Sequence, residues 1–218
     1  MIHEDNFRHQ GLRRNLVLLL ESKGIRDARV LAAIGKIPRH IFFETALVSH
    51  AYQDKAFPIG EGQTISQPYT VARQTELLDI KPGHKILEIG TGSGYQCSVL
   101  MELKATVYTI EYQPVLFYRT KKILPEILGY HPNFFLGDGS KGIPHFAPFD
   151  RILVTAGAPA IPQPLIDQLA PNGILVIPAG NNEKQEMIRI MKHSDGKITE
   201  ERFGNFSFVP LKGAFGWT

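Results

Sequence analysis

The stretch that decides the fold is residues 85–95, which read KILEIGTGSGY. The largely apolar segment Lys85 to Ile89 predicts a short strand, and the glycines after it turn the chain into a helix that reaches about Leu103. Glycines in such a turn let backbone N–H groups approach a ligand, and the N-terminus of the helix points at that ligand. This order of elements is typical of the edge where an α/β sheet binds nucleotides.

Downstream of this stretch, short apolar segments alternate with helical ones. We expect strands over 106–110, 133–136, 151–154 and 174–177, and helices over 113–128 and 164–169. Strands and helices at this spacing indicate βαβ units and a mainly parallel sheet. Two later segments, 186–191 and 198–209, predict a hairpin around Gly196 and therefore an antiparallel edge. The expected fold class is α/β, with a doubly wound, mainly parallel, Rossmann-like sheet.

Upstream, the sequence predicts a helical N-terminal subregion. Leucines recur at helical spacing over Leu12–Leu19, and Asp27 is placed to cap a short helix over 28–34 that Gly35 ends. Residues 52–69 are rich in proline and glycine and predict a long loop, which is typical of a functional segment. A helix over 71–78 then leads into the decisive strand.

Composition and charge exclude several classes of protein. The 218 residues carry 24 Lys and Arg against 21 Asp and Glu, without a basic run, so we expect no nucleic-acid partner. Cys97 is the only cysteine, which excludes an intramolecular disulfide, and the eight histidines show no metal-ligand spacing, so we expect no metal. The apolar run Leu16 to Leu20 is far shorter than the about 20 residues of a membrane span. The opening Met1 to Asp5 lacks a basic signal segment, and we expect a cytoplasmic monomer without membrane contact.

Three acidic residues stand at the ends of successive predicted strands. Glu88 precedes the first glycine by two positions, and Glu111 ends the next strand, where a carboxylate can accept hydrogen bonds from both hydroxyls of a ribose. Asp138 follows the third strand and could accept from an adenine amino group, while Gly139 leaves room for the ring. Tyr95 replaces the third glycine of a dinucleotide fingerprint, which favours S-adenosylmethionine over a pyrophosphate ligand. The expected cofactor-binding residues are Glu88, Gly90, Thr91, Gly92, Ser93, Gly94, Glu111, Tyr112, Asp138 and Gly139.

At these residues the sequence resembles class I S-adenosylmethionine-dependent methyltransferases, and more closely the protein-L-isoaspartate O-methyltransferase family. The most specific match is GQTISQPY at 62–69, and the resemblance runs from about Val30 to Leu211. Other matching stretches are 37–40, 51–54, 58–60, 86–95, 137–139, 149–152, 154–156, 158–159 and 208–211. The sequence departs from the family at Gln74, where methionine is expected, and at Gly157, where alanine is usual and glycine could loosen the loop.

The resemblance implies a repair reaction. A methyl group passes from S-adenosylmethionine to the α-carboxylate of an L-isoaspartyl residue in damaged proteins and peptides, which leaves S-adenosylhomocysteine. The ester closes to a succinimide, whose hydrolysis returns some normal aspartate. The resemblance makes Ser66 the active-site serine. Because the acceptor is already ionised at neutral pH, we expect Ser66 to orient the carboxylate rather than to act as a covalent nucleophile.

The residues expected to hold the peptide are Thr64, Ile65, Gln67, Val209, Pro210 and Leu211. We divide the chain into a helical N-terminal region with the substrate loop, residues 1–69, and a methyltransferase core that binds S-adenosylmethionine, residues 70–218.

Three alternatives stay open from sequence. The first is a methyltransferase that acts on RNA or a small molecule, although TAGAP at 155–159 lacks the tetrad of base N-methyltransferases and Cys97 is misplaced for C5 chemistry. The second is a non-catalytic binding module, which the presence of Glu88, Glu111, Asp138 and Ser66 disfavours. The third is a nicotinamide-dependent dehydrogenase, which Tyr95 disfavours.

Overall fold

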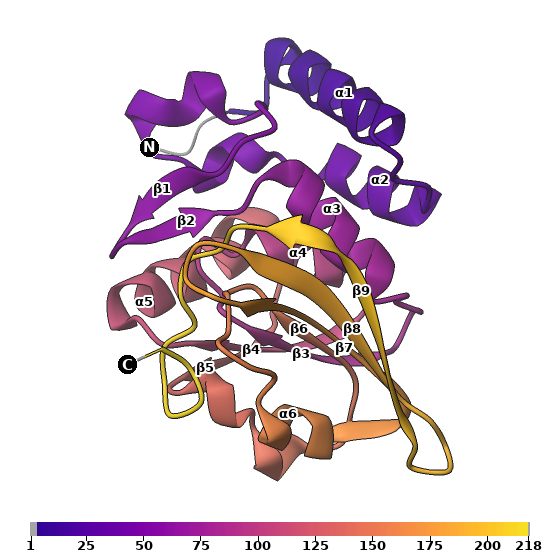
Figure 1. Ribbon diagram of the computed structural model, residues 1–218. Coiled ribbons are helices and arrows are strands. Elements are labelled where there is room, and N and C mark those ends of the chain that lie inside the picture. Colours follow the sequence, from indigo (N-terminus) through magenta and orange to yellow (C-terminus); the bar gives the residue numbers. More distant parts are fainter. Residues whose placement is uncertain (1–3, 218) are drawn as a thin grey trace.

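A single seven-stranded sheet organises the chain, and its strand order is β5-β4-β3-β6-β7-β8-β9 (Figure 1). The computed structural model describes residues 4–217, so Met1 to His3 of the predicted opening lie outside the described residues. The strands are β3 (Lys85–Ile89), β4 (Thr106–Glu111), β5 (Asn133–Leu136), β6 (Phe149–Val154), β7 (Leu169–Gly180), β8 (Gln185–Lys192) and β9 (Ile198–Phe206). The first five strands of this order are parallel, β8 pairs antiparallel with β7, and β9 pairs antiparallel with β8. The predicted fold class is confirmed.

The sheet lies between two layers that bury its opposite faces. One face packs against α3 (Pro68–Leu77), α4 (Tyr95–Glu102) and α5 (Pro114–Ile123), and the other packs against α6 (Gln163–Asp167) (Figure 1). The helices α1 (Phe7–Ser22) and α2 (Ala28–Lys36) lie further from the sheet, where they contact α3 and α4. Within β3, Ile86 belongs to the first hydrophobic cluster and Leu87 to the second. This separation follows from the alternation of side chains along a strand, and β3 is largely apolar because both of its faces are covered.

Short helical turns connect these elements. They are the 3-10 helices η1 (Arg39–Phe42), η2 (Thr45–His50), η4 (Gly139–Lys141) and η5 (Pro144–Phe146), and the π-helical turn η3 (Leu124–Leu128) at the end of α5. Within residues 4–217, no helix is both long and apolar enough to cross a lipid bilayer.

The N-terminal helices pack onto the core rather than forming a separate body. Asp27 caps α2 as predicted, because its side chain accepts a hydrogen bond from the Arg29 backbone at 2.9 Å. The helix continues through Gly35 to Lys36, so the predicted stop at Gly35 is wrong. A Cβ at Gly35 would lie 3.4 Å from Val17 of α1, so Gly35 faces α1 where the two helices pack. The domain division at residue 69 falls inside α3 and stays a prediction.

The predicted loop over 52–69 contains a β-hairpin that the sequence did not reveal. Its strands are β1 (Phe57–Gly60) and β2 (Gln63–Ile65), and the prediction of an irregular loop is wrong there. The two turn residues, Glu61 and Gly62, have φ of 53° and 66°. Positive φ at both positions is the geometry of a tight hairpin turn, which a glycine-rich sequence allows. The hairpin leads directly into Ser66 and α3.

Candidate active site

The carboxyl ends of three neighbouring strands form the centre of the site. β3 is flanked by β4 and β6, at the point where the strand order reverses and α/β sheets bind ligands. Gly90 follows β3 and has φ of 94°, a conformation that L side chains rarely adopt. A Cβ at Gly90 would overlap the hydroxyl of Thr155, which donates to the Gly90 carbonyl at 2.7 Å. The glycine therefore brings the loop against the end of β6.

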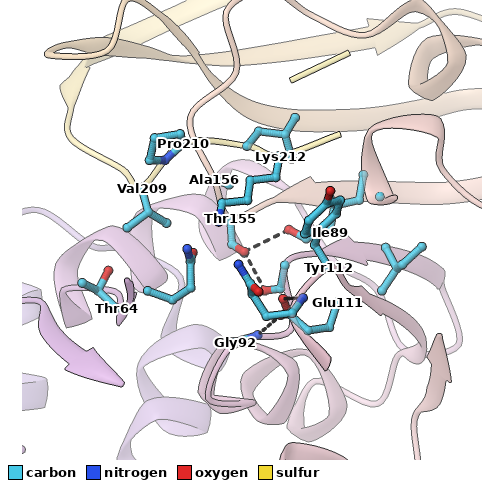
Figure 2. A pocket seen from close by; sticks show the side chains of 16 residues that line it. Thr64, Ile89, Gly92, Glu111, Tyr112, Thr155, Ala156, Val209, Pro210 and Lys212 are labelled. Carbon is cyan, nitrogen blue, oxygen red and sulfur yellow. Dashed lines mark hydrogen bonds between the residues drawn. The ribbon is translucent and has the colours of Figure 1, made fainter. Parts of the chain in front are cut away.

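A small pocket of about 60 Å³ opens above these strand ends. Figure 2 shows Gly92 and Glu111 on one side of it and Val209, Pro210 and Lys212 on the other. The predicted cofactor-binding residues that line it are Gly90, Gly92, Glu111, Tyr112 and Gly139, and the predicted substrate residues are Thr64, Val209, Pro210 and Leu211. The structure thus brings together residues that lie more than a hundred positions apart in the sequence.

Glu111 fixes the shape of the glycine loop. One carboxylate oxygen accepts a hydrogen bond from the Gly92 backbone N–H, and the other accepts from the Gln113 N–H, both at 2.8 Å. The side chain is buried at the end of β4. Because a carboxylate has about four acceptor positions, each oxygen of Glu111 retains capacity for a ligand in the pocket.

A second, open cavity of about 800 Å³ lies beside the first and is lined by Ser66, Gln67 and the segment 203–209. A narrow space of about 30 Å³, lined by Ile65, Ser66, Thr91 and Ser93, lies between the glycine loop and the hairpin. Thr64 and Thr155 line all three spaces. We call the region around Thr64, Ser66 and Thr155 the junction, because the small pocket and the open cavity meet there.

Glu88 lies behind the glycine loop, and it lines none of these three spaces. It is fully buried on the α4 face of the sheet, where Thr109 Oγ1 donates to Glu88 Oε2 at 2.6 Å. Burial raises the pKa of Glu88 to about 8, and it also raises the pKa of the adjacent Cys97 thiol. The predicted carboxylate is therefore a neutral acid at pH 7. Alternation along β3 explains the placement, because Ile89 takes the face toward the pocket.

Asp138 also lies outside the small pocket, although Gly139 lines it. Its carboxylate accepts hydrogen bonds from the Ser140 N–H at 3.0 Å, the Ser140 hydroxyl at 2.6 Å and the Ala214 N–H at 2.9 Å. Burial raises the pKa of Asp138, but these hydrogen bonds outweigh it and hold the pKa below its usual value. In this structure Asp138 holds the C-terminal segment that borders the pocket.

Two of the predicted residues shape the site without lining the small pocket. Gly94 begins α4 with φ of 87°, and a Cβ there would lie 2.7 Å from Thr120. Gly94 is therefore needed for close contact between α4 and α5. Ile65 is 2% exposed, so it presents mainly backbone to the junction.

Gly157 tightens the site rather than loosening it. Its N–H donates to the Val209 carbonyl and its carbonyl accepts from the Leu211 N–H, both at 2.8 Å. A Cβ at Gly157 would lie 2.9 Å from Cδ of Gln185, whose Oε1 accepts from the Phe208 N–H at 2.9 Å. The sequence analysis missed Gln185 and Thr155. Thr155 follows a predicted strand at the binding edge and could have been found, whereas nothing in the sequence singled out Gln185.

The fold and this pocket define a class I S-adenosylmethionine-dependent methyltransferase. The family model described as protein-L-isoaspartate(D-aspartate) O-methyltransferase matches residues 12–215. The chain belongs to that family. This confirms the resemblance seen in the sequence.

Known relatives agree with this assignment. A protein-L-isoaspartate O-methyltransferase of Cytophaga hutchinsonii is 59% identical over 98% of this chain and 96% of its own length, and one of Flavobacterium johnsoniae is 55% identical over 95% and 97%. A solved protein-L-isoaspartate O-methyltransferase superposes with a TM-score of 0.82 at 28% identity, covering 94% of this chain and 67% of the other. A Plasmodium falciparum structure of that name, in complex with S-adenosyl-L-homocysteine, gives 0.75 at 26% identity over 92% and 98%.

Proposed function

We propose that this chain transfers a methyl group from S-adenosylmethionine to the α-carboxylate of L-isoaspartyl residues in damaged proteins and peptides. The observation that carries the proposal is the junction, where a pocket on the glycine loop meets an open cavity beside Ser66. Relatives with 55% and 59% identity carry the name of this activity, and the Plasmodium falciparum neighbour binds S-adenosyl-L-homocysteine. The proposed product is S-adenosylhomocysteine together with the methyl ester.

The small pocket suits the cofactor. Glu111 has acceptor capacity left for the two ribose hydroxyls, and Gly139, which presents no side chain to the pocket that it lines, suits contact with the adenine. Gly90 and Gly92 place the backbone of the glycine loop next to the methionine part of the cofactor. When bound, S-adenosylmethionine supplies an electrophilic methyl group on a sulfonium.

Ser66 suits the orientation of the acceptor carboxylate. The Ser66 carbonyl accepts a hydrogen bond from Arg39 Nη2 at 2.9 Å, which fixes the loop, while within residues 4–217 the hydroxyl makes no hydrogen bond. The hydroxyl can donate to one oxygen of a carboxylate and leave the other aimed at the methyl group. Because carboxylate and sulfonium neutralise each other during transfer, shielding from water favours the reaction.

The open cavity suits an extended peptide. Gln67 is held in place because its amide donates to Asp54 at 3.0 Å, and Val209 is held by its pairing with Gly157. Both residues line the cavity, so hydrogen bonds fix two points of its wall. Fixed contacts beside the peptide backbone would recognise the extra methylene of isoaspartate with little dependence on neighbouring side chains.

We further propose that the enzyme acts as a cytoplasmic monomer without nucleic-acid or membrane partners. The single cysteine is a free, buried thiol, which suits a reducing compartment.

The test of the proposed function compares two peptides of identical sequence, one with isoaspartate and one with aspartate. We expect methylation of the isoaspartyl peptide only, with a base-labile product that releases methanol. Equal labelling of both peptides, or a base-stable product, would contradict the proposed function and favour the RNA or small-molecule alternative.

Replacing Ser66 with alanine is expected to slow methyl transfer roughly 10- to 150-fold without preventing cofactor binding. A lost hydrogen bond to a charged group is worth about 1.5–3 kcal/mol, and each 1.36 kcal/mol is tenfold in rate. Single-turnover rates at saturating cofactor and peptide measure the effect. Full activity would show that backbone donors alone place the carboxylate, and complete loss with a trapped methyl-enzyme in the wild type would indicate a covalent nucleophile.

A further inference from the structure

Arg39 is a buried cation to which the proposed reaction gives no role beyond holding the Ser66 carbonyl. Its side chain is 0% exposed, and it donates to the Ala51 carbonyl from Nε and to the Ser66 carbonyl from Nη2, both at 2.9 Å. Nη1 has no hydrogen-bond partner of normal geometry within residues 4–217. Burial lowers the pKa of Arg39 to about 10, so the guanidinium stays charged at neutral pH.

Among the described residues, no carboxylate lies within 4.0 Å of this guanidinium. Asp54 contributes attraction from further away, but its oxygens already bind Lys23 at 2.6 Å, the Gln67 amide and the Tyr69 N–H. A buried charge without a paired counter-charge is costly. The surroundings of Arg39 are therefore short of negative charge.

The positive charge of Arg39 lies close to the junction. Its guanidinium carbon lies 4.5 Å from the centre of the Tyr95 ring, and Tyr95 and Ser66 both line the narrow space at the junction. The buried Tyr95 hydroxyl also lacks a partner of normal geometry. The Arg39 guanidinium and the Tyr95 hydroxyl interact with each other, and both lie behind the wall where the proposed reactants meet.

Arg13 provides the contrast within the same part of the chain. It is 7% exposed, but it donates to both oxygens of Asp5, at 3.0 and 2.9 Å. Among residues 4–217, one of these two buried arginines is therefore paired with a carboxylate and the other has no carboxylate within 4.0 Å.

We propose that Arg39 is a positioning residue whose positive charge draws a carboxylate into the junction beside Ser66. The inference rests on the proposed function, in which two carboxylates approach this point. These are the α-carboxylate of the isoaspartyl residue and the methionine carboxylate of the cofactor. Arg39 acts on either carboxylate through the wall formed by Ser66 and Tyr95. The bound carboxylate in turn supplies the negative counter-charge that Arg39 lacks among the described residues.

The test measures the binding preference for a charged ligand over its neutral counterpart, rather than catalytic activity. Dissociation constants are measured by calorimetry on the full chain with saturating S-adenosylhomocysteine, for an isoaspartyl peptide and for the same peptide with its α-carboxylate replaced by a carboxamide. For the cofactor, S-adenosylhomocysteine is compared with 5′-methylthioadenosine, which lacks the amino-acid carboxylate. In Arg39→Met we expect the preference for the carboxylate in one of these pairs to fall roughly 10-fold. The variant loses the attraction between the Arg39 charge and that carboxylate, which acts at an effective dielectric constant of about 20. The pair that responds identifies the carboxylate.

Two further variants separate charge from structure. Arg39→Lys keeps the charge and is expected to keep the preference, whereas Arg13→Met removes a buried arginine that is already paired and is expected to lower the melting temperature only. Arg39→Gln replaces Arg39→Met if that variant does not fold. Equal weakening of both members of each pair in a neutral variant, or unchanged preference, would overturn the proposal. Both readouts are binding constants, so they stay separate from the methylation test of the proposed function.

Discussion

Replacing Glu88 with glutamine is expected to remove a decline in stability that the wild-type protein shows between about pH 4.5 and 8. The folded pKa is about 8 and the ordinary value is 4.5, so in this window the folded state binds a proton that the unfolded state releases. The free energy of unfolding therefore falls as the pH rises, by at most about 5 kcal/mol at 1.36 kcal/mol per unit. Glutamine can still accept the hydrogen bond from Thr109 and carries no charge to desolvate.

Denaturant unfolding of the cofactor-free protein at pH 5, 7 and 9 measures this effect. We expect wild type and Glu88→Gln to have similar stability near pH 4.5 and the variant to be the more stable at pH 9. Glu102→Gln is the matched control, because Lys36 and Tyr130 bind Glu102, outweigh its burial and hold its pKa below the usual value. That variant is expected to lose stability at pH 7 and to approach wild type at low pH. Parallel profiles for wild type and Glu88→Gln would show that Glu88 is ionised when buried.

Replacing Glu111 with alanine is expected to weaken S-adenosylhomocysteine binding roughly 100-fold. The change removes the acceptor proposed for the ribose, and it also leaves the Gly92 and Gln113 N–H groups without their partner. Losses of about 1.5–3 kcal/mol for hydrogen bonds to a charged group give an effect of this size. Calorimetric titration measures it.

Glu111→Gln is the control for this second prediction. Its amide oxygen can keep one of the two backbone contacts, so we expect an intermediate loss of affinity. An affinity of Glu111→Ala within twofold of wild type would contradict both the ribose assignment and the role of Glu111 in shaping the glycine loop.

The central strands could be predicted because their signals are local. β3 and β5 have the predicted bounds, since each is a short apolar run between turn residues. β7 was predicted over 174–177 but runs from Leu169 to Gly180, because pairing with β6 and β8 extends it and those partners are distant in sequence. The β1–β2 hairpin was missed because Pro58 and Gly62 favour a loop when only neighbouring residues are considered.

The same distinction between nearby and distant residues in the sequence applies to the site. The glycine loop and Glu111 depend on a strand, a turn and the next strand, so their meeting could be predicted from spacing. The surroundings of Asp138 could not, because they depend on the return of Ala214, 76 residues later. Glu88 shows a further limit: three acidic residues near strand ends suggested a shared role, but the side-chain alternation within β3 gives Glu88 a buried environment of its own.

Because Cys97 is buried, its reaction with a thiol reagent reports opening of the surrounding core. It is the only thiol in the chain, it is 0% exposed, and it lies in α4 directly after the glycine loop. A thiol reagent can reach it only when this part of the core opens, so the rate of labelling counts those excursions. A ligand that binds only the closed form slows labelling by a factor of one plus its concentration divided by its dissociation constant. Labelling kinetics would therefore measure cofactor affinity without a peptide substrate or a mutation.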